Sequence, residues 1–201
     1  MPSKPYHHDH LRGELIRATR AVVERDGADA MTIAGVAAMC EVSVAAPYRH
    51  FAHRQALLGA VAAEGFHELR TALTLGAGAS SEPAERLVAS GVAYVDFALT
   101  HPHLFRLMFD ADVRDPAAAA PQALDGLAAL IEPLDLAVTT ETALRVTWAL
   151  AHGIASLRIG GMRTFIENDS PERVRDELQT LLGGIVREHG AAASDGTPAS
   201  S

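Results

Sequence analysis

The stretch MTIAGVAAMCEVSVAAPYRHFAHRQALLGAV, residues 31–61, decides the fold of the N-terminal part of this chain. Thr32 is placed to cap a short helix over residues 33–40, which has an apolar face. A tight turn at residues 41–42 follows, and Ser43 is placed to cap a second helix whose first residues are small. Two short helices joined by a tight turn predict a helix-turn-helix unit.

Helical periodicity continues on both sides of this stretch, and no segment shows the strict alternation that is typical of a β-strand. Residues 8–26 predict a helix that ends at Gly27. Beyond the helix-turn-helix we expect helices over residues 54–73, 83–100, 103–109, 123–131, 140–160 and 171–186. The sequence therefore predicts an all-α protein of about nine helices.

Composition narrows the class of protein. The chain has 201 residues, of which 48% are hydrophobic and 21% charged, values typical of a soluble globular protein. No apolar run approaches the roughly 18 residues that a membrane span needs, and residues 1–15 lack the apolar stretch of a signal peptide. The single cysteine, Cys40, excludes an intrachain disulfide framework, and we expect it to pack at the end of the second helix. A cytoplasmic protein is the simplest expectation.

Charge is distributed unevenly along the chain. The formal net charge is −8, yet residues 1–60 contain seven Lys and Arg against six Asp and Glu, a net of +1. Residues 61–201 contain ten against nineteen, a net of −9. A polyanion such as DNA would be repelled by the second part and tolerated by the first.

The helix-turn-helix suggests how the N-terminal part would contact DNA. Such a unit places its second helix in the major groove, where small side chains allow the backbone to approach the base edges. Arg49 is the long donor beside this face, and Tyr48, His50 and Arg54 can donate to phosphates. In isolation Tyr48 and Phe51 could both be core aromatics; within the whole pattern we assign only Phe51 to the core. The predicted DNA-binding residues are Thr32, Ser43, Val44, Ala45, Pro47, Tyr48, Arg49, His50 and Arg54.

Residues 31–61 resemble the DNA-binding domain of TetR-family transcriptional regulators. The shared features are the capping threonine, the V-S pair at the turn, the sequence Y-R-H-F and the L-L pair of the following helix. Residues 6–27 are similar to the first helix of that domain, and residues 94–109 and WALAHGIASL (148–157) resemble a C-terminal subgroup with the signature W-x-x-x-H-G. The resemblance implies a homodimeric regulator that binds a palindromic operator, most often a repressor released by a small-molecule effector.

Three positions depart from the pattern of the family. Glu41 stands where the family usually has a glycine, at a turn position that favours a positive φ. We therefore expect either strain at Glu41 or a reshaped turn, at a cost of about 1 kcal/mol. Arg54 replaces a usual lysine and keeps its charge, and Pro47 replaces a common leucine in the first helical turn, where proline is tolerated.

We divide the chain into a DNA-binding domain (1–53), a helical effector-binding and dimerisation domain (54–190) and a disordered tail (191–201). In the second domain, aromatic and polar side chains on neighbouring helices suit an apolar ligand with a polar handle, although residues at helical spacing also simply fill cores. The predicted ligand-binding residues are Phe66, Tyr94, Phe97, His101, Phe105, Met108, Phe109, Trp148 and His152. The last helix and the small side chains of Ala149, Gly153, Ala155 and Gly160 suggest the dimer interface.

The sequence also bears on two other classes of function. An all-α enzyme is disfavoured because the chain has no nucleophile elbow, phosphate loop or spaced pair of carboxylates. No cofactor is expected, and His7, His8 and His10 do not share one helical face, so no metal site is predicted. A regulator without a ligand, controlled by a partner protein, remains the alternative within the regulator class.

Overall fold

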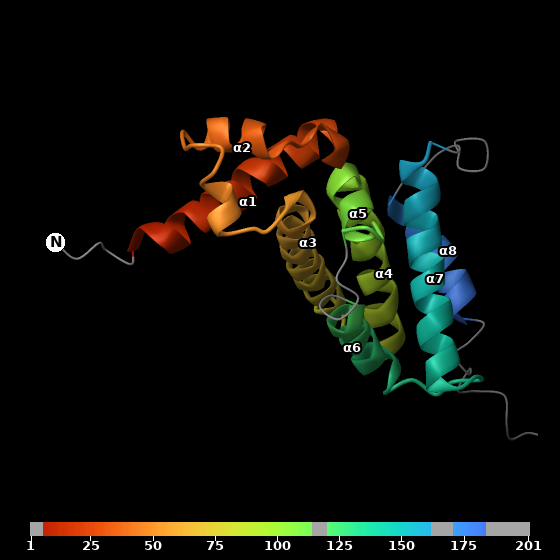
Figure 1. Cartoon of the computed structure of the whole chain (residues 1–201). Coiled ribbons are helices and arrows are strands. Elements are labelled where there is room, and N and C mark those ends of the chain that lie inside the picture. Colours follow the sequence, from red (N-terminus) through yellow and green to blue (C-terminus); the bar gives the residue numbers. More distant parts are fainter. Residues whose placement is uncertain (1–5, 114–119, 162–170, 184–201) are drawn as a thin grey trace, which may run out of the picture.

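The computed structural model describes residues 6–113, 120–161 and 171–183, and eight α-helices and two short 3-10 helices make up its regular structure (Figure 1). The α-helices are α1 (Tyr6–Asp26), α2 (Ile33–Met39), α3 (Arg54–Ala77), α4 (Pro83–Thr100), α5 (Pro102–Met108), α6 (Ala120–Ile131), α7 (Thr140–Ile159) and α8 (Pro171–Gly183). The 3-10 helices are η1 (Ala28–Ala30) and η2 (Pro47–Arg49). The predicted all-α fold is confirmed. The predicted tail and the end of the last predicted helix lie outside the described residues.

The helices begin where side chains can satisfy their first N–H groups. The Thr32 hydroxyl accepts from Gly35 N at 3.1 Å, and the Thr139 hydroxyl accepts from Thr142 N at 3.3 Å. The His53 ring accepts from Ala56 N at 3.1 Å and so caps α3, a role that the sequence did not suggest. Proline occupies the first position of both α4 and α5, where its missing N–H costs nothing.

The helices form an N-terminal unit and a larger body. In Figure 1 α1, η1 and α2 lie at one end, α3 runs from this unit into the body, and α7 and α8 lie side by side on the side of the body away from it. One core is continuous between the two parts, because Val23 and Ile33 of the N-terminal unit share a buried cluster with Leu57 of α3 and Leu104 of α5. A second cluster joins α4, α6, α7 and α8. The N-terminal unit therefore rests directly on α3 and α5.

A polar network also joins the N-terminal unit to the body. The Arg20 guanidinium of α1 forms a bidentate ion pair with Glu68 of α3, in which Nη1 donates to Oε1 and Nη2 donates to Oε2 at 2.8 Å. Arg20 also reaches Glu24, whose Oε1 lies 2.9 Å from His101 Nδ1 between α4 and α5. The Arg20 hydrogen bond lowers the pKa of the Glu68 carboxyl. His101, predicted to bind ligand, instead contacts the N-terminal unit.

Candidate nucleic-acid interface and ligand cavity

Of the two outcomes expected at Glu41, the turn after α2 shows the strained positive φ and not a reshaped turn. Glu41 has a φ of 57°, the only positive φ of a non-glycine residue in the described part of the chain. The turn closes through Glu41 N donating to Ala38 O at 3.1 Å and Val42 N donating to Ala37 O at 3.0 Å. A non-glycine side chain in the left-handed region is strained.

The segment after the turn is tighter than expected. Instead of an α-helix that begins at Ser43, the chain forms a turn, with Ala46 N donating to Ser43 O at 2.9 Å, followed by the 3-10 helix η2. The predicted capping by the Ser43 side chain is wrong, because Ala46 holds the cap position of η2 and no side chain caps it. Pro47 has no N–H with which to continue an α-helical ladder from residue 43, which favours the shorter turns.

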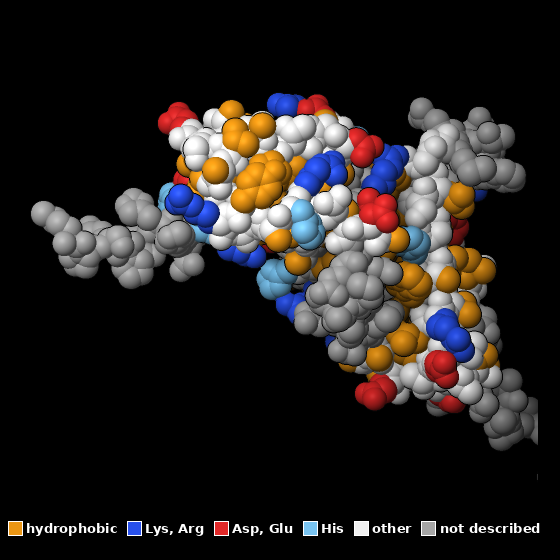
Figure 2. Space-filling view, viewed as in Figure 1, with side chains coloured by type: hydrophobic (Ala, Val, Ile, Leu, Met, Phe, Trp, Pro, Cys, Tyr) orange, Lys and Arg blue, Asp and Glu red, His pale blue; other side chains and the backbone are white. Residues whose placement is uncertain are grey.

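This segment exposes most of the side chains that were predicted to contact DNA. Val44 and Tyr48 are each 54% exposed, Ala45 and Arg49 are exposed, and His50 is partly exposed. Figure 2 shows hydrophobic side chains together with Lys and Arg on the N-terminal end of the molecule. Large apolar side chains that stay exposed on a well-packed unit indicate a contact surface.

Three residues in this region stabilise the unit itself, two by packing and one by capping a helix. Phe51 is 4% exposed, as predicted, and the Arg12 guanidinium carbon lies 5.2 Å from the centre of its ring. Pro47, predicted to contact DNA, is buried. Its ring packs inward because the 3-10 turn directs it away from the exposed face formed by its neighbours. Thr32 keeps its exposed position, but its hydroxyl oxygen is engaged in the cap of α2.

Arg54 fastens the start of α3 to the N-terminal unit. Its Nε donates to Met31 O at 2.9 Å, and its Nη2 donates to Ala28 O. The predicted phosphate contact needs a guanidinium that can turn outward, whereas this one is held by two backbone carbonyls of the segment between α1 and α2. The sequence could not show this role, because only the folded chain brings those carbonyls to residue 54.

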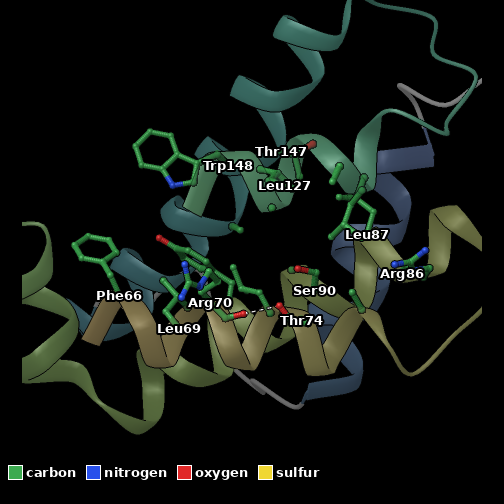
Figure 3. Close-up of a pocket in the computed structure, with 18 of the residues that line it drawn as sticks. Phe66, Leu69, Arg70, Thr74, Arg86, Leu87, Ser90, Leu127, Thr147 and Trp148 are labelled. Atoms are coloured by element: carbon green, nitrogen blue, oxygen red, sulfur yellow. Dashed lines mark hydrogen bonds between the residues drawn. The ribbon is translucent and has the colours of Figure 1, made fainter. Parts of the chain in front are cut away.

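A cavity of about 300 Å³ lies in the body between α3, α4, α6 and α7 (Figure 3). Four of the predicted ligand-binding residues line it, namely Phe66, Tyr94, Phe109 and Trp148. Aliphatic side chains of α3, α4 and α6 complete most of the wall, among them Leu73, Leu87, Leu127 and Leu130. Most of the wall is therefore apolar, as expected of a site for a small organic molecule.

The other five predicted ligand-binding residues do not line this cavity. Phe97, Phe105 and Met108 are 7%, 3% and 0% exposed and belong to the continuous core. A Cβ atom on Gly65 would lie 2.8 Å from Met108 Sδ, which shows how closely α5 packs against α3. Helical spacing selects inward-facing residues, but it cannot separate a solid core from the wall of a cavity.

His152 lies behind the cavity wall, in a nest of aromatic rings. Its Nδ1 is 3.0 Å from the Tyr94 hydroxyl, and its ring stacks with Phe105 and Trp148 at centroid distances of 5.5 and 5.4 Å. Burial lowers the pKa of His152 and raises the pKa of Tyr94, so both groups are neutral at pH 7. His152 orients the Tyr94 hydroxyl and does not reach the cavity itself.

The sequence reasoning missed the polar part of the wall. Arg70, Thr74, Arg86, Ser90 and Thr147 line the cavity. Among the lining residues that the structure describes there is no aspartate or glutamate. A signal was available, because Ser90 and Thr147 are small polar residues at buried positions of the otherwise largely apolar inner faces of α4 and α7.

Residues 15–61 match the family described as bacterial regulatory proteins of the tetR family, and residues 87–182 match the tetracyclin repressor-like C-terminal domain. The chain belongs to the TetR family of transcriptional regulators. This TetR-family chain is thus a DNA-binding transcriptional regulator and not an enzyme. None of the curated proteins compared with the chain matches it.

Solved structures support the same architecture. A protein of unknown function from Rhodococcus sp. RHA1 is 32% identical, with 92% of this regulator and 100% of that chain covered and a TM-score of 0.71. A TetR-family transcription regulator from Marinobacter aquaeolei VT8 is 15% identical, with 92% and 100% covered and a TM-score of 0.64. A regulatory protein of the tetR family from Rhodococcus RHA1 is 21% identical, with 87% and 96% covered and a TM-score of 0.57. The last two show the likeness of the fold alone.

One further finding concerns membranes. Within the described ranges, no helix is both long and apolar enough to cross a lipid bilayer.

Proposed function

We propose that this regulator is a homodimeric repressor that leaves its palindromic operator when a small, mainly apolar effector fills the cavity of the body. The observation that carries the proposal is the combination of an exposed segment at one end, residues 43–50, and an apolar cavity in the other part of the chain. We call residues 43–50 the reading segment. We place the boundary between the two functions at residues 53 and 54. The protein would act in the cytoplasm, where its operator DNA lies.

The reading segment supports DNA contact through its exposed side chains. Val44 and Ala45 are small enough for the backbone to approach base edges, and Tyr48 and Arg49 extend outward beside them. Arg49 is the strongest donor in this group. We therefore assign base reading to Arg49 and phosphate contact to Tyr48 and His50.

The test of DNA reading is Arg49→Ala. Affinity for the operator should fall by about 1–3 kcal/mol, whereas affinity for random DNA should fall less, because a bidentate base contact discriminates between sequences. The operator would be sought as a palindrome in the DNA upstream of the regulator's own gene, and binding would be measured by fluorescence anisotropy. Equal losses on both DNAs would show that Arg49 contacts phosphate only.

Dimerisation is proposed from an uncovered stripe on α7. Val146, Ala149, Gly153, Leu157 and Gly160 follow one another at spacings of three and four residues, and Val146 and Leu157 are each 46% exposed. On α8, beside α7 in Figure 1, Leu181 is 52% exposed. An apolar stripe of this length on a two-helix face supports a symmetrical four-helix interface.

The residues of the proposed interface differ in one respect from those expected. Ala155 is fully buried in the core of the protomer and does not belong to the stripe. Gly153 does belong to it, since a Cβ atom there would meet nothing within 4 Å of the described chain. We propose that the W-x-x-x-H-G signature of Trp148, His152 and Gly153 combines two roles, a cavity wall with its supporting histidine and a close helix contact.

Helix α3 is the proposed connection between the cavity and the DNA-binding unit. Its middle lines the cavity through Phe66 and Arg70, and its first residue, Arg54, holds the carbonyls of Ala28 and Met31. A ligand that favours one tilt of α3 would carry the N-terminal unit with it, provided that it binds that state more tightly.

The experiment for the effector proposal is an operator-binding titration with and without ligand. Phe66→Ala should leave operator affinity nearly unchanged and should weaken release by the effector, because Phe66 lines the cavity far from the reading segment. Release of the variant at wild-type ligand concentrations would contradict this route. A regulator controlled by a partner protein would show no ligand-dependent release and no ligand-dependent rise in melting temperature.

A further inference from the structure

The reading segment exposes an aliphatic side chain at a well-braced point of the backbone. Val44 is 54% exposed, and it lies in the turn that Ala46 N closes by donating to Ser43 O at 2.9 Å. The preceding turn is closed by Val42 N donating to Ala37 O at 3.0 Å. Branching at Cβ restricts a valine side chain to few rotamers. The two methyl groups of Val44 therefore point in few directions before any partner binds.

The exposure of Val44 contrasts with that of the valines in the helices beside it. Three valines of α1 and α2 are buried in the core, namely Val22, Val23 and Val36. Between residues 10 and 53, the exposed large apolar side chains are Met39, Val44 and Tyr48. All three fall within residues 39–48, at the end of the molecule where Figure 2 shows hydrophobic side chains beside Lys and Arg. Apolar side chains gathered in this way mark a contact site for a partner that has apolar groups of its own.

DNA offers this surface one kind of apolar group. The chain belongs to a DNA-binding family, and Arg49 is exposed in the same segment as Val44. The base edges in the major groove carry hydrogen-bond donors and acceptors, and their one apolar group is the C5 methyl of thymine. A valine side chain over a donor or acceptor would remove its water without replacing the hydrogen bond, which costs free energy. Over a thymine methyl group it buries two apolar surfaces, which is favourable.

We propose that Val44 is a specificity-determining residue that reads the C5 methyl group of one thymine in each operator half-site. The inference deepens the proposed function and rests on the assignment of residues 43–50 as the reading segment. Arg49 selects its base by hydrogen bonds, whereas Val44 selects by an apolar contact, so the two side chains recognise bases by different chemistry. The contact of Val44 also accepts 5-methylcytosine, whose methyl group occupies the same place in the major groove.

The choice of Val44 over its two apolar neighbours follows from the shapes of the side chains. Met39 has three rotatable bonds and would lose more conformational freedom in a contact. Tyr48 carries a hydroxyl that suits a phosphate oxygen. Ser43 and Ala45, on either side of Val44, are exposed and small, so the backbone can bring Val44 close to the base edges.

The first test removes one methyl group at a time from the DNA. The probe is a duplex that the full-length protein selects from a random-sequence library, so its choice assumes nothing about the operator. Each thymine is replaced in turn by deoxyuridine, which pairs identically and lacks only the C5 methyl group. At one thymine of each half-site the affinity, measured by fluorescence anisotropy, should fall about fourfold, the factor that corresponds to burying one CH₂-sized group. Unchanged affinity at every thymine would overturn the proposal.

The second test links the methyl group to Val44 by a double-mutant cycle. Val44→Ala should bind the thymine and deoxyuridine duplexes with equal affinity, because the methyl group has lost its partner on the protein. Val44→Thr, which keeps the branched shape and one methyl group, should retain part of the difference. If the difference persists undiminished in Val44→Ala, another residue makes the contact and the proposal is wrong.

The third test places the methyl group on a different base. At the sensitive position, the T·A pair is replaced by C·G with and without a methyl group at C5 of the cytosine. The wild-type protein should bind the methylated duplex about fourfold more tightly than the unmethylated one, and Val44→Ala should not distinguish them. Equal binding of both duplexes by the wild-type protein would contradict a contact that recognises the methyl group.

Val138 provides a matched control for these measurements. It is 36% exposed and precedes α7 in the body of the protein. Val138→Ala should keep the preference for thymine over deoxyuridine. Both alanine variants should keep the circular dichroism spectrum and the urea midpoint of the wild-type protein, because substitutions at exposed positions change stability little. If Val138→Ala loses the preference as Val44→Ala does, the preference does not come from a contact of Val44.

The methyl contact and the reading segment can fail separately. If Arg49→Ala weakens binding to the selected duplex while no thymine methyl group affects it, the reading segment is supported and the role of Val44 is wrong. If neither Val44→Ala nor Arg49→Ala changes the affinity for that duplex, the assignment of residues 43–50 to DNA reading is wrong, and this inference is wrong with it.

Discussion

Gly153→Ala separates the stability of one protomer from the stability of the proposed dimer. Gly153 lies inside α7, where alanine is favoured over glycine by about 0.8–1.0 kcal/mol. An added Cβ atom would meet nothing within 4 Å in the described protomer. A single protomer should therefore become more stable by about 1 kcal/mol, which corresponds to a rise of about 2–4 °C in melting temperature for a chain of this size.

A second copy packed on α7 changes this result. Because the interface would be symmetrical, the substitution inserts two methyl groups, each with an overpacking cost of typically 1–3 kcal/mol. The helix-propensity gain is the same in free and paired protomers and cancels from the dimer equilibrium. The free energy of dimerisation should therefore become less favourable by about 2–6 kcal/mol. The dimer dissociation constant should rise at least roughly thirtyfold.

Two other glycines serve as controls. Gly126→Ala on α6 also meets nothing within 4 Å and should raise stability without affecting the dimer. Gly76→Ala should destabilise the protomer itself, because its Cβ would lie 2.9 Å from both Ala89 O and Ala93 Cβ across the contact of α3 with α4. Sedimentation velocity over a range of concentrations measures the dimer, and urea denaturation measures the fold. If Gly153→Ala behaves like Gly126→Ala in both assays, the interface does not include α7 at Gly153.

Three further predictions concern particular side chains. Glu41→Gly should raise the free energy of unfolding by about 1 kcal/mol by relieving the positive φ, and Glu41→Ala, which keeps the strain, should not; urea denaturation compares them. Arg54→Met should cost about 2–4 kcal/mol of stability by removing two charge-assisted hydrogen bonds, with Arg54→Lys between it and wild type; a loss of DNA affinity with unchanged unfolding would restore the phosphate contact. Burial lowers the pKa of His152 in the folded protein, so below about pH 6.5 the unfolded chain binds more protons than the folded chain does. The free energy of unfolding therefore decreases as the pH is lowered through that range. His152→Gln should reduce this fall between about pH 7 and about pH 5, and an unchanged slope would show that another group is responsible.

The fold could be predicted from the sequence because its signals are local. The N-cap at Thr32, the positive φ expected at Glu41 and the prolines at the starts of α4 and α5 each depend on a few consecutive residues, and all are present. The resemblance to TetR regulators was carried by the same short patterns, and the family comparison bears it out. The failure at Ser43 was also local, since Pro47 was accepted in an α-helix where the chain forms a 3-10 turn.

The ligand-binding residues were less predictable from the sequence than the fold was. Nine aromatic and polar residues were expected to bind ligand, and only four line the cavity, because inward-facing positions of a helix bundle look alike in sequence whether they meet another side chain or an empty space. Arg70 and Thr147 were missed for the same reason. Their significance comes from what surrounds them, because both line the cavity and the Thr147 hydroxyl is buried without a hydrogen-bond partner in the described part of the chain.

The sequence by itself determined most of the helices and the family, since capping, turn chemistry and periodicity are properties of neighbouring residues. The tertiary structure alone decided which side chains share a space. It turned Arg54 inward to the carbonyls of Met31 and Ala28, tied His101 to Glu24 and left a cavity beside Thr147. These outcomes depend on how α3, α4 and α7 pack, and packing is set by contacts between residues that lie far apart in the chain.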